Sequence, residues 1–168
     1  MKTDRGWINL GLLLLAAALF LTVYNRMASY EAGETSRQVI EQLCQTLPTE
    51  SAAETEAPAI PEYLLDAGRE MPVQTIDGKD YVGVLTIPAL ELELPVQAQW
   101  SYDGLQKSPG RFSGSTFSDD LTVCAHNYPA HFGRLRSLSQ GEEIDFTDMD
   151  GMVWIYEVSY VTVLEPED

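Results

Sequence analysis

An unbroken apolar run near the N-terminus is the feature that most limits how this chain can fold. Between Trp7 and Tyr24 the only clearly polar residues are Asn9 and Thr22. A helix over residues 7–24 would be about 27 Å long, which is close to the hydrocarbon thickness of a bilayer. No polar stripe divides the run, so it lacks the pattern of a helix buried in a soluble core. The run therefore predicts one transmembrane helix over residues 7–24.

The charges on either side of this run indicate its direction in the membrane. Lys2 and Arg5 precede the run and Arg26 follows it. Together with the N-terminal amine, they favour residues 1–6 in the cytoplasm and the bulk of the chain outside the cell. A cleaved signal peptide is the alternative interpretation, but no small-x-small cleavage site closely follows Tyr24. We therefore expect an uncleaved signal anchor and a single-pass protein of the cell membrane, with its domain extracellular.

Residues 25–74 have the composition of a stalk. Apolar residues recur at helical spacing between Gln38 and Leu47. Residues 48–61 are rich in Ala, Glu, Thr and Pro, a composition that cannot bury enough surface to order itself. We therefore expect a partly helical, partly disordered acidic stalk over residues 25–74, which holds the rest of the chain away from the membrane.

The whole chain is strongly acidic. It has 26 Asp and Glu against 10 Lys and Arg, a formal net charge of -16. This balance argues against a nucleic-acid partner, because binding phosphates needs a basic face. The two cysteines are too few for a disulfide-stapled mini-domain or a four-cysteine zinc site. They also lack the CxxC spacing of a redox motif.

Patterns typical of β-strands replace helical ones after residue 75. The predicted strands are 81–87, 91–96, 121–126, 144–149 and 152–164. Segment 81–87 is rich in β-branched residues and stops at Pro88. Segment 91–96 alternates acidic and apolar residues, as a half-buried strand does. The last two segments flank Asp150-Gly151, a dipeptide typical of hairpin turns because both residues tolerate positive φ. We expect a mainly β domain over residues 75–168, built as a barrel or a sandwich.

The two histidines are the main candidates for chemistry. His126 ends an apolar strand pattern, which predicts a position at a strand-to-loop rim. There a histidine either transfers protons near neutral pH or bonds to the backbone as a structural residue. His131, beside Phe132 and Gly133, is expected to pack or cap the loop. The two histidines are five residues apart with a proline between them, and no third ligand is evident, so we expect no metal site.

Cys124 lies two residues before His126, so the two side chains share one face of the predicted strand. A cysteine–histidine pair can supply a thiol nucleophile. However, neighbours on one face of one strand leave no groove between them for a substrate, and an apolar strand favours an inert, buried thiol.

Arg134 and Arg136 are expected to form surface salt bridges in this acidic chain.

An ordered series of motifs resembles the sortase family. The first group, Tyr81–Pro88 and Leu90–Val96, resembles the opening pair of strands of that family. The second group leads to the family histidine and consists of Leu105, Pro109-Gly110, Ser113-Gly114 and Val123–Asn127. The third group follows in the same order and consists of Phe132–Leu135, Leu138, Gly141–Ile144 and Asp150-Gly151. The resemblance covers residues 81–168 and agrees with an anchor and a stalk in front. It implies a sortase-type β-barrel and a membrane-anchored cysteine transpeptidase, a thiol-protease-like hydrolase, of a Gram-positive bacterium.

The resemblance also implies a reaction. A thiolate attacks the Thr carbonyl of a sorting signal such as Leu-Pro-x-Thr-Gly and forms a thioester, while a histidine moves the protons and an arginine stabilises the oxyanion. Sorting-signal peptides of secreted surface proteins and an amine acceptor on the cell wall or a pilin are the implied partners, with no cofactor. His126 is the residue that matches the family histidine.

No position in the chain matches the other two catalytic groups of the family. The family cysteine ends a later strand in a Thr-Leu-x-Thr-Cys-like motif, and the arginine lies shortly beyond it. We therefore expect an incomplete barrel without its C-terminal strands, in a truncated chain that is inactive alone. The alternative is a catalytically inactive, membrane-anchored module that binds sorting-signal peptides. A third interpretation, an acidic surface spacer, does not require an ordered β domain.

Overall fold

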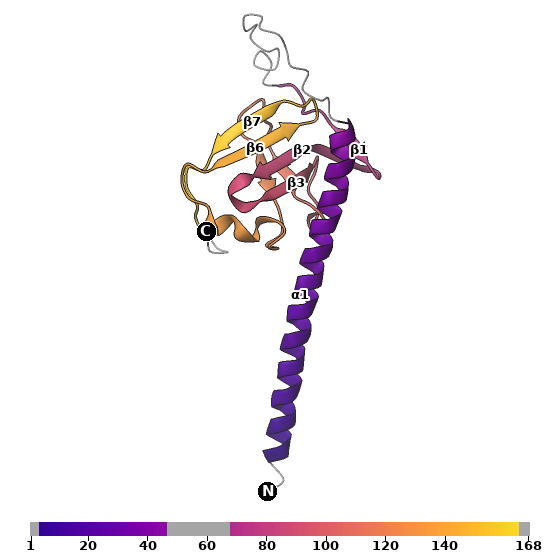
Figure 1. Ribbon diagram of the computed structural model, residues 1–168, viewed down its shortest axis with the longest axis vertical. Coiled ribbons are helices and arrows are strands. Elements are labelled where there is room, and N and C mark those ends of the chain that lie inside the picture. The colour runs from indigo at the N-terminus through magenta and orange to yellow at the C-terminus, as the bar shows by residue number, and fades with distance from the viewer. Residues whose placement is uncertain (1–3, 47–67, 165–168) are drawn as a thin grey trace, which may run out of the picture.

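One long helix and a small β domain make up the computed structural model, which describes residues 4–46 and 68–164 (Figure 1). The helix, α1, runs from Asp4 to Thr46. The other elements are β1 (Gln74–Ile76), β2 (Lys79–Ile87), the 3-10 helix η2 (Pro88–Leu90), β3 (Leu92–Gln97), α2 (Tyr102–Leu105), β4 (Gly110–Ser113), β5 (Thr122–Cys124), the 3-10 helix η3 (Phe132–Ser137), β6 (Glu143–Asp148) and β7 (Val153–Glu157). The expectation of a mainly β domain behind an N-terminal apolar helix is confirmed.

The strands form one sheet in the order β5-β4-β3-β2-β6-β7, and β1 adds to β2. Neighbouring strands are antiparallel, except that β3 and β4 are parallel. The segment that joins β3 to β4 contains α2. The sheet curls enough for its two ends to approach each other through side chains. Phe117, from the loop before β5, meets Trp154 of β7 edge to face at 5.7 Å between ring centroids. The result is a half-barrel, with β5 and β7 at its two open ends.

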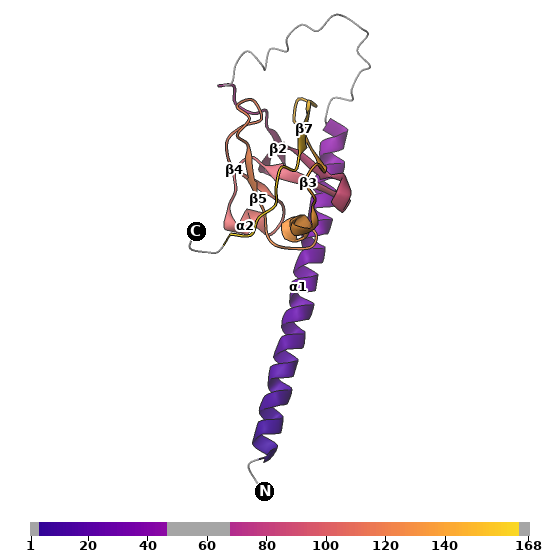
Figure 2. The ribbon, with the colours of Figure 1, turned by 90° about the vertical axis from the view of Figure 1, so that its left-hand side faces the viewer.

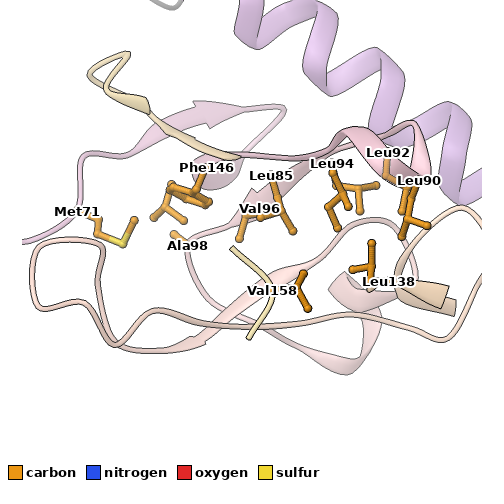
Figure 3. Packing of buried hydrophobic residues seen from close by; sticks show 12 residues of the cluster. Met71, Leu85, Leu90, Leu92, Leu94, Val96, Ala98, Leu138, Phe146 and Val158 are labelled. Carbon is orange, nitrogen blue, oxygen red and sulfur yellow. The ribbon is translucent and has the colours of Figure 1, made fainter. Parts of the chain in front are cut away.

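The concave side of the half-barrel holds the main core (Figure 3). Val96, Leu94 and Phe146 are almost completely buried there, and Leu90 and Leu138 close one end. Met71 is also a member of this core. Because Met71 precedes residue 75, the packed domain starts earlier than the sequence patterns predict.

The C-terminal half of α1 covers part of the other face of the sheet. Val39 and Leu43 of α1 pack against Val84 of β2, and Val84 lies opposite Pro95 of β3. The expected alternation of residues 91–96 therefore holds only through Leu94, since Pro95 and its successors are buried as well. A strand that is covered on both faces loses the half-buried pattern.

The segment predicted to be a stalk is thus helical as far as Thr46, and one face of it lies on the domain. Residues 48–61, for which disorder is predicted, lie outside the described residues. Within the described residues, α1 is the one helix long and apolar enough to cross a membrane, and its most apolar stretch is not covered by protein. Such a stretch is typical of a membrane anchor or of a signal sequence. The division of the chain into anchor, stalk and domain stays a prediction.

The predicted hairpin is present, with β6 paired to β7 in register from Glu143–Glu157 to Thr147–Val153. The second strand is shorter than the expected 152–164, because the ladder finishes at Glu157. Val158 then turns into the core, where its backbone bonds to Gly141 and Glu142.

One buried carboxylate organises the hairpin turn. Asp148, only 1% exposed, accepts hydrogen bonds from the backbone N–H groups of Asp150 and Met152 and from the indole N–H of Trp154, at 3.0, 2.9 and 3.1 Å. It therefore links the turn to β7 and to the side chain that meets Phe117.

Replacing Asp148 with alanine is expected to destabilise the domain by about 2–3 kcal/mol, because several donors lose a charged acceptor in a buried position. Asp150→Ala is the matched control. It removes an exposed ion pair with Arg69, 2.7 Å long, and such a pair contributes about 0–1 kcal/mol. Urea unfolding followed by tryptophan fluorescence measures both, and equal losses in the two variants would contradict this role of Asp148.

Candidate active site

His126 lies at the rim where β5 ends. The strand stops at Cys124, two residues earlier than the predicted strand 121–126, so His126 stands in the loop that leads to η3. Its side chain is half-buried, and its ring stacks on the ring of Tyr128 with centroids 4.9 Å apart. The imidazole is accordingly both held in place and partly open to solvent, as acid–base chemistry requires.

Backbone contacts hold the loop around His126 in a tight turn. The carbonyl of Tyr128 accepts hydrogen bonds from the N–H groups of His131 and Gly133, both at 2.9 Å. The carbonyl of His126 accepts from Phe132 at 3.3 Å. A β-carbon at Gly133 would lie 2.8 Å from the Tyr128 carbonyl oxygen, so this close approach needs a glycine. Tyr128 was not identified by sequence reasoning, where the only available signal is an aromatic residue two positions after a histidine.

His131 is completely buried between this loop and α1. Neither ring nitrogen has a hydrogen-bond partner among the described residues, and the ring lies at 5.7 Å from that of Tyr128. This placement confirms the expected packing role, whereas no capping bond from its side chain forms. Burial, followed by the nearby charge of His126, lowers the pKa of His131, although the backbone at Lys107 and Ala32 opposes the change.

The domain is therefore expected to lose stability as the pH falls below 6.5, the ordinary pKa of histidine. His131 has a lowered pKa in the folded state, so the unfolded state binds more protons below that pH and protonation favours unfolding. His131→Phe keeps a ring of similar size and removes the titration. The slope of melting temperature against pH should be smaller in His131→Phe than in wild type, with His126→Ala as the histidine control. Parallel slopes would contradict the assignment.

Cys124 does not have the surroundings of an activated nucleophile. Its thiol donates a hydrogen bond to the carbonyl of Gly110 at 3.5 Å, on the strand that pairs with β5. Burial raises the pKa of this thiol, which lowers the fraction of thiolate near neutral pH. The arrangement agrees with the inert thiol that an apolar strand favours.

Arg134 and Arg136 do not form the expected salt bridges with any described residue. Arg134 instead donates to two backbone carbonyls, those of Leu90 at 2.5 Å and Pro129 at 3.2 Å. It thereby ties η3 to η2 and to the histidine loop.

Over residues 4–46 and 68–164, no three His, Cys, Asp or Glu side chains converge where a metal ion could bind.

Comparisons with known proteins find one matching family model and several similar solved structures. A family model described as the sortase domain matches residues 85–168. Among solved structures, sortase C1 from Streptococcus suis is 28% identical with a TM-score of 0.45, covering 52% of this chain and 53% of that one. Sortase C of Streptococcus pneumoniae is 21% identical, with a TM-score of 0.46 and coverage of 84% and 71%.

A third solved structure, a sortase D5 transpeptidase of Clostridium perfringens, is 18% identical with a TM-score of 0.46, covering 56% of this chain and 62% of that one. The chain spans about half the length of the Streptococcus suis protein. A search of curated proteins finds no match.

Proposed function

Since this chain belongs to the sortase family, whose members are in general cysteine transpeptidases, we propose that it provides His126 as the proton-transfer group of a sortase-type transpeptidase. One observation carries this assignment. Within the residues that the family model matches, His126 is the histidine with a half-buried ring in the loop that follows β5, whereas His131 is completely buried.

The proposed reaction is acyl transfer from a sorting signal such as Leu-Pro-x-Thr-Gly to an amine. The thiolate bonds to the Thr carbonyl carbon, and the Thr–Gly bond breaks as His126 gives a proton to the leaving amine. The incoming amine of a cell-wall or pilin acceptor then loses a proton to His126 and bonds to the carbonyl carbon, the thioester C–S bond breaks, and the thiolate is regenerated. Acid–base catalysis of this kind contributes about 100- to 10,000-fold.

We assign the thiolate to a cysteine other than Cys124. The Cys124 thiol is engaged with the Gly110 carbonyl and its pKa is raised, whereas a catalytic thiol needs an environment that stabilises the thiolate.

The apolar half of α1 supports a membrane anchor, and the charges that flank it favour the domain on the outer side of the membrane. Residues 7–24 are exposed along their length, which is costly in water and favourable in a bilayer.

A peptide-binding module without catalysis is the second candidate function, and the unactivated thiol of Cys124 is the observation that favours it.

A transfer assay distinguishes these functions. Membranes containing the natural gene product, or its Cys124→Ser variant, are incubated with a Leu-Pro-x-Thr-Gly peptide and an amine acceptor, and the protein is then mapped by mass spectrometry. We expect equal transfer by both proteins and a thioester on a cysteine other than Cys124. A thioester on Cys124 would overturn the assignment of the thiol. Peptide binding without any adduct would support the binding module, and the absence of both would contradict the substrate class.

A further inference from the structure

A cavity of about 780 Å³ separates α1 from the domain at the end of the apolar run. One wall consists of α1 residues from Thr22 to Arg37, and the other consists of Pro129, Ala130 and Arg134. Figures 1 and 2 show η3, in orange, on the side of the domain that faces the N-terminal half of α1. Since the apolar run ends at Tyr24, a helix rise of 1.5 Å per residue places Arg26 about 3 Å beyond it.

The cavity is basic although the chain is acidic. Three of its lining residues are arginines, Arg26, Arg37 and Arg134, and the only acidic one is Glu34. Glu34 pairs with Arg37 at 3.4 Å. Among the described residues, Arg26 has no ion-pair partner. Arg134 is held by two carbonyls, which orient the guanidinium without neutralising its charge. The lining therefore has an excess of positive charge in a chain of net charge -16.

Apolar surface lies between these arginines. The ring of Tyr30 is 70% exposed and lines the cavity opposite Pro129 and Ala130. Tyrosines are enriched where a membrane meets water, because one end of the ring is apolar and the other polar. A ligand with an anionic group and an apolar or glycerol-like body matches this combination of surfaces.

We propose that this cavity binds the phosphate headgroup of an anionic phospholipid in the leaflet from which α1 emerges. The guanidinium of Arg26 presents its donors in a planar fork that matches phosphate oxygens, whereas Arg134, which already donates to two carbonyls, adds positive charge. Pro129 and Ala130 line the cavity and belong to the loop that carries His126, so a bound headgroup contacts this loop and fixes the domain close to the bilayer. This inference rests on the proposed anchor and is independent of the transpeptidase reaction.

Native mass spectrometry of the full chain tests this site. The protein is purified from detergent micelles containing phosphatidylcholine alone or mixed with phosphatidylglycerol, and the retained lipid is counted. We expect retention of one phosphatidylglycerol per chain. Arg26→Gln and Arg134→Gln should each weaken that binding about fivefold. Arg136→Gln is the matched control, because Arg136 lies on η3 without lining the cavity, and should leave the binding unchanged.

Several outcomes would overturn the site. These are equal retention of the two lipids, an equal loss in Arg136→Gln, and displacement of phosphatidylglycerol by inorganic phosphate, which would make this a site for free phosphate. Arg26 lies on the exposed part of α1, so its variant keeps the test valid if Arg134→Gln misfolds.

Alkaline extraction of the membranes tests the anchor separately. A chain that stays in the membrane without preferring phosphatidylglycerol contradicts the headgroup site alone, whereas a released chain contradicts the anchor.

Discussion

His126→Ala is expected to lower peptide transfer by about 100- to 10,000-fold, the range that acid–base catalysis supplies. The imidazole is the only half-buried histidine ring in the described domain and stands at the end of β5, stacked on Tyr128. Alanine removes the proton carrier without changing a core position. The folded domain should therefore persist while the transfer rate falls, which melting curves and initial rates of transfer measure together.

His131→Phe is the matched control for that substitution. His131 belongs to the same loop, but its ring is completely buried beneath α1, where it cannot meet a substrate. We expect His131→Phe to retain most of the transfer activity. If both substitutions abolish transfer, the loop as a whole rather than the His126 imidazole is required. If His126→Ala transfers peptide at the wild-type rate, the proposed role of His126 is wrong.

Local patterns predicted the strands but not what covers them. The segment 81–87 and the Asp150-Gly151 hairpin were evident because side-chain alternation and turn residues act over a few positions. The burial of Pro95 was not evident from the sequence, since it depends on Val39 and Leu43 of α1, which lie more than fifty positions earlier in the chain. No spacing rule links such segments.

The candidate site was predicted in part for the same reason. The position of His126 at a rim follows from the apolar strand before it and the turn-forming residues after it. The contacts of Arg134 could not be foreseen, because its partner Leu90 is 44 residues away and accepts through a backbone carbonyl. Surface arginines in an acidic chain suggest ion pairs, and only the folded arrangement shows that a carbonyl is the acceptor instead.

Gly83→Ala is expected to destabilise the domain by about 3 kcal/mol or more, because it overpacks the centre of the sheet. Gly83 lies on β2, between β3 and β6, opposite Asp148. An added β-carbon would overlap the ring of Phe146 and would lie 2.5 Å from the carbonyl oxygen of Thr147. Phe146 is 1% exposed in the main core, so its ring has no free space to enter.

Gly141→Ala separates this steric effect from backbone strain. Gly141 has a φ of +87° but nothing within 4 Å of an added β-carbon, so alanine there costs about 1–2 kcal/mol through backbone conformation alone. Urea unfolding should therefore show a clearly larger loss for Gly83→Ala. Equal losses in the two variants would contradict the overlap.

A double variant, Gly83→Ala with Phe146→Leu, identifies the group that causes the loss. Leucine removes the ring that the new methyl group would meet, so the double variant should lose less stability than the sum of the two single variants. The contact with the Thr147 carbonyl remains, and recovery is therefore partial. Strict additivity would show that Phe146 does not limit the space at Gly83, and the cost would then belong to the separation of β2 from β6 at that carbonyl.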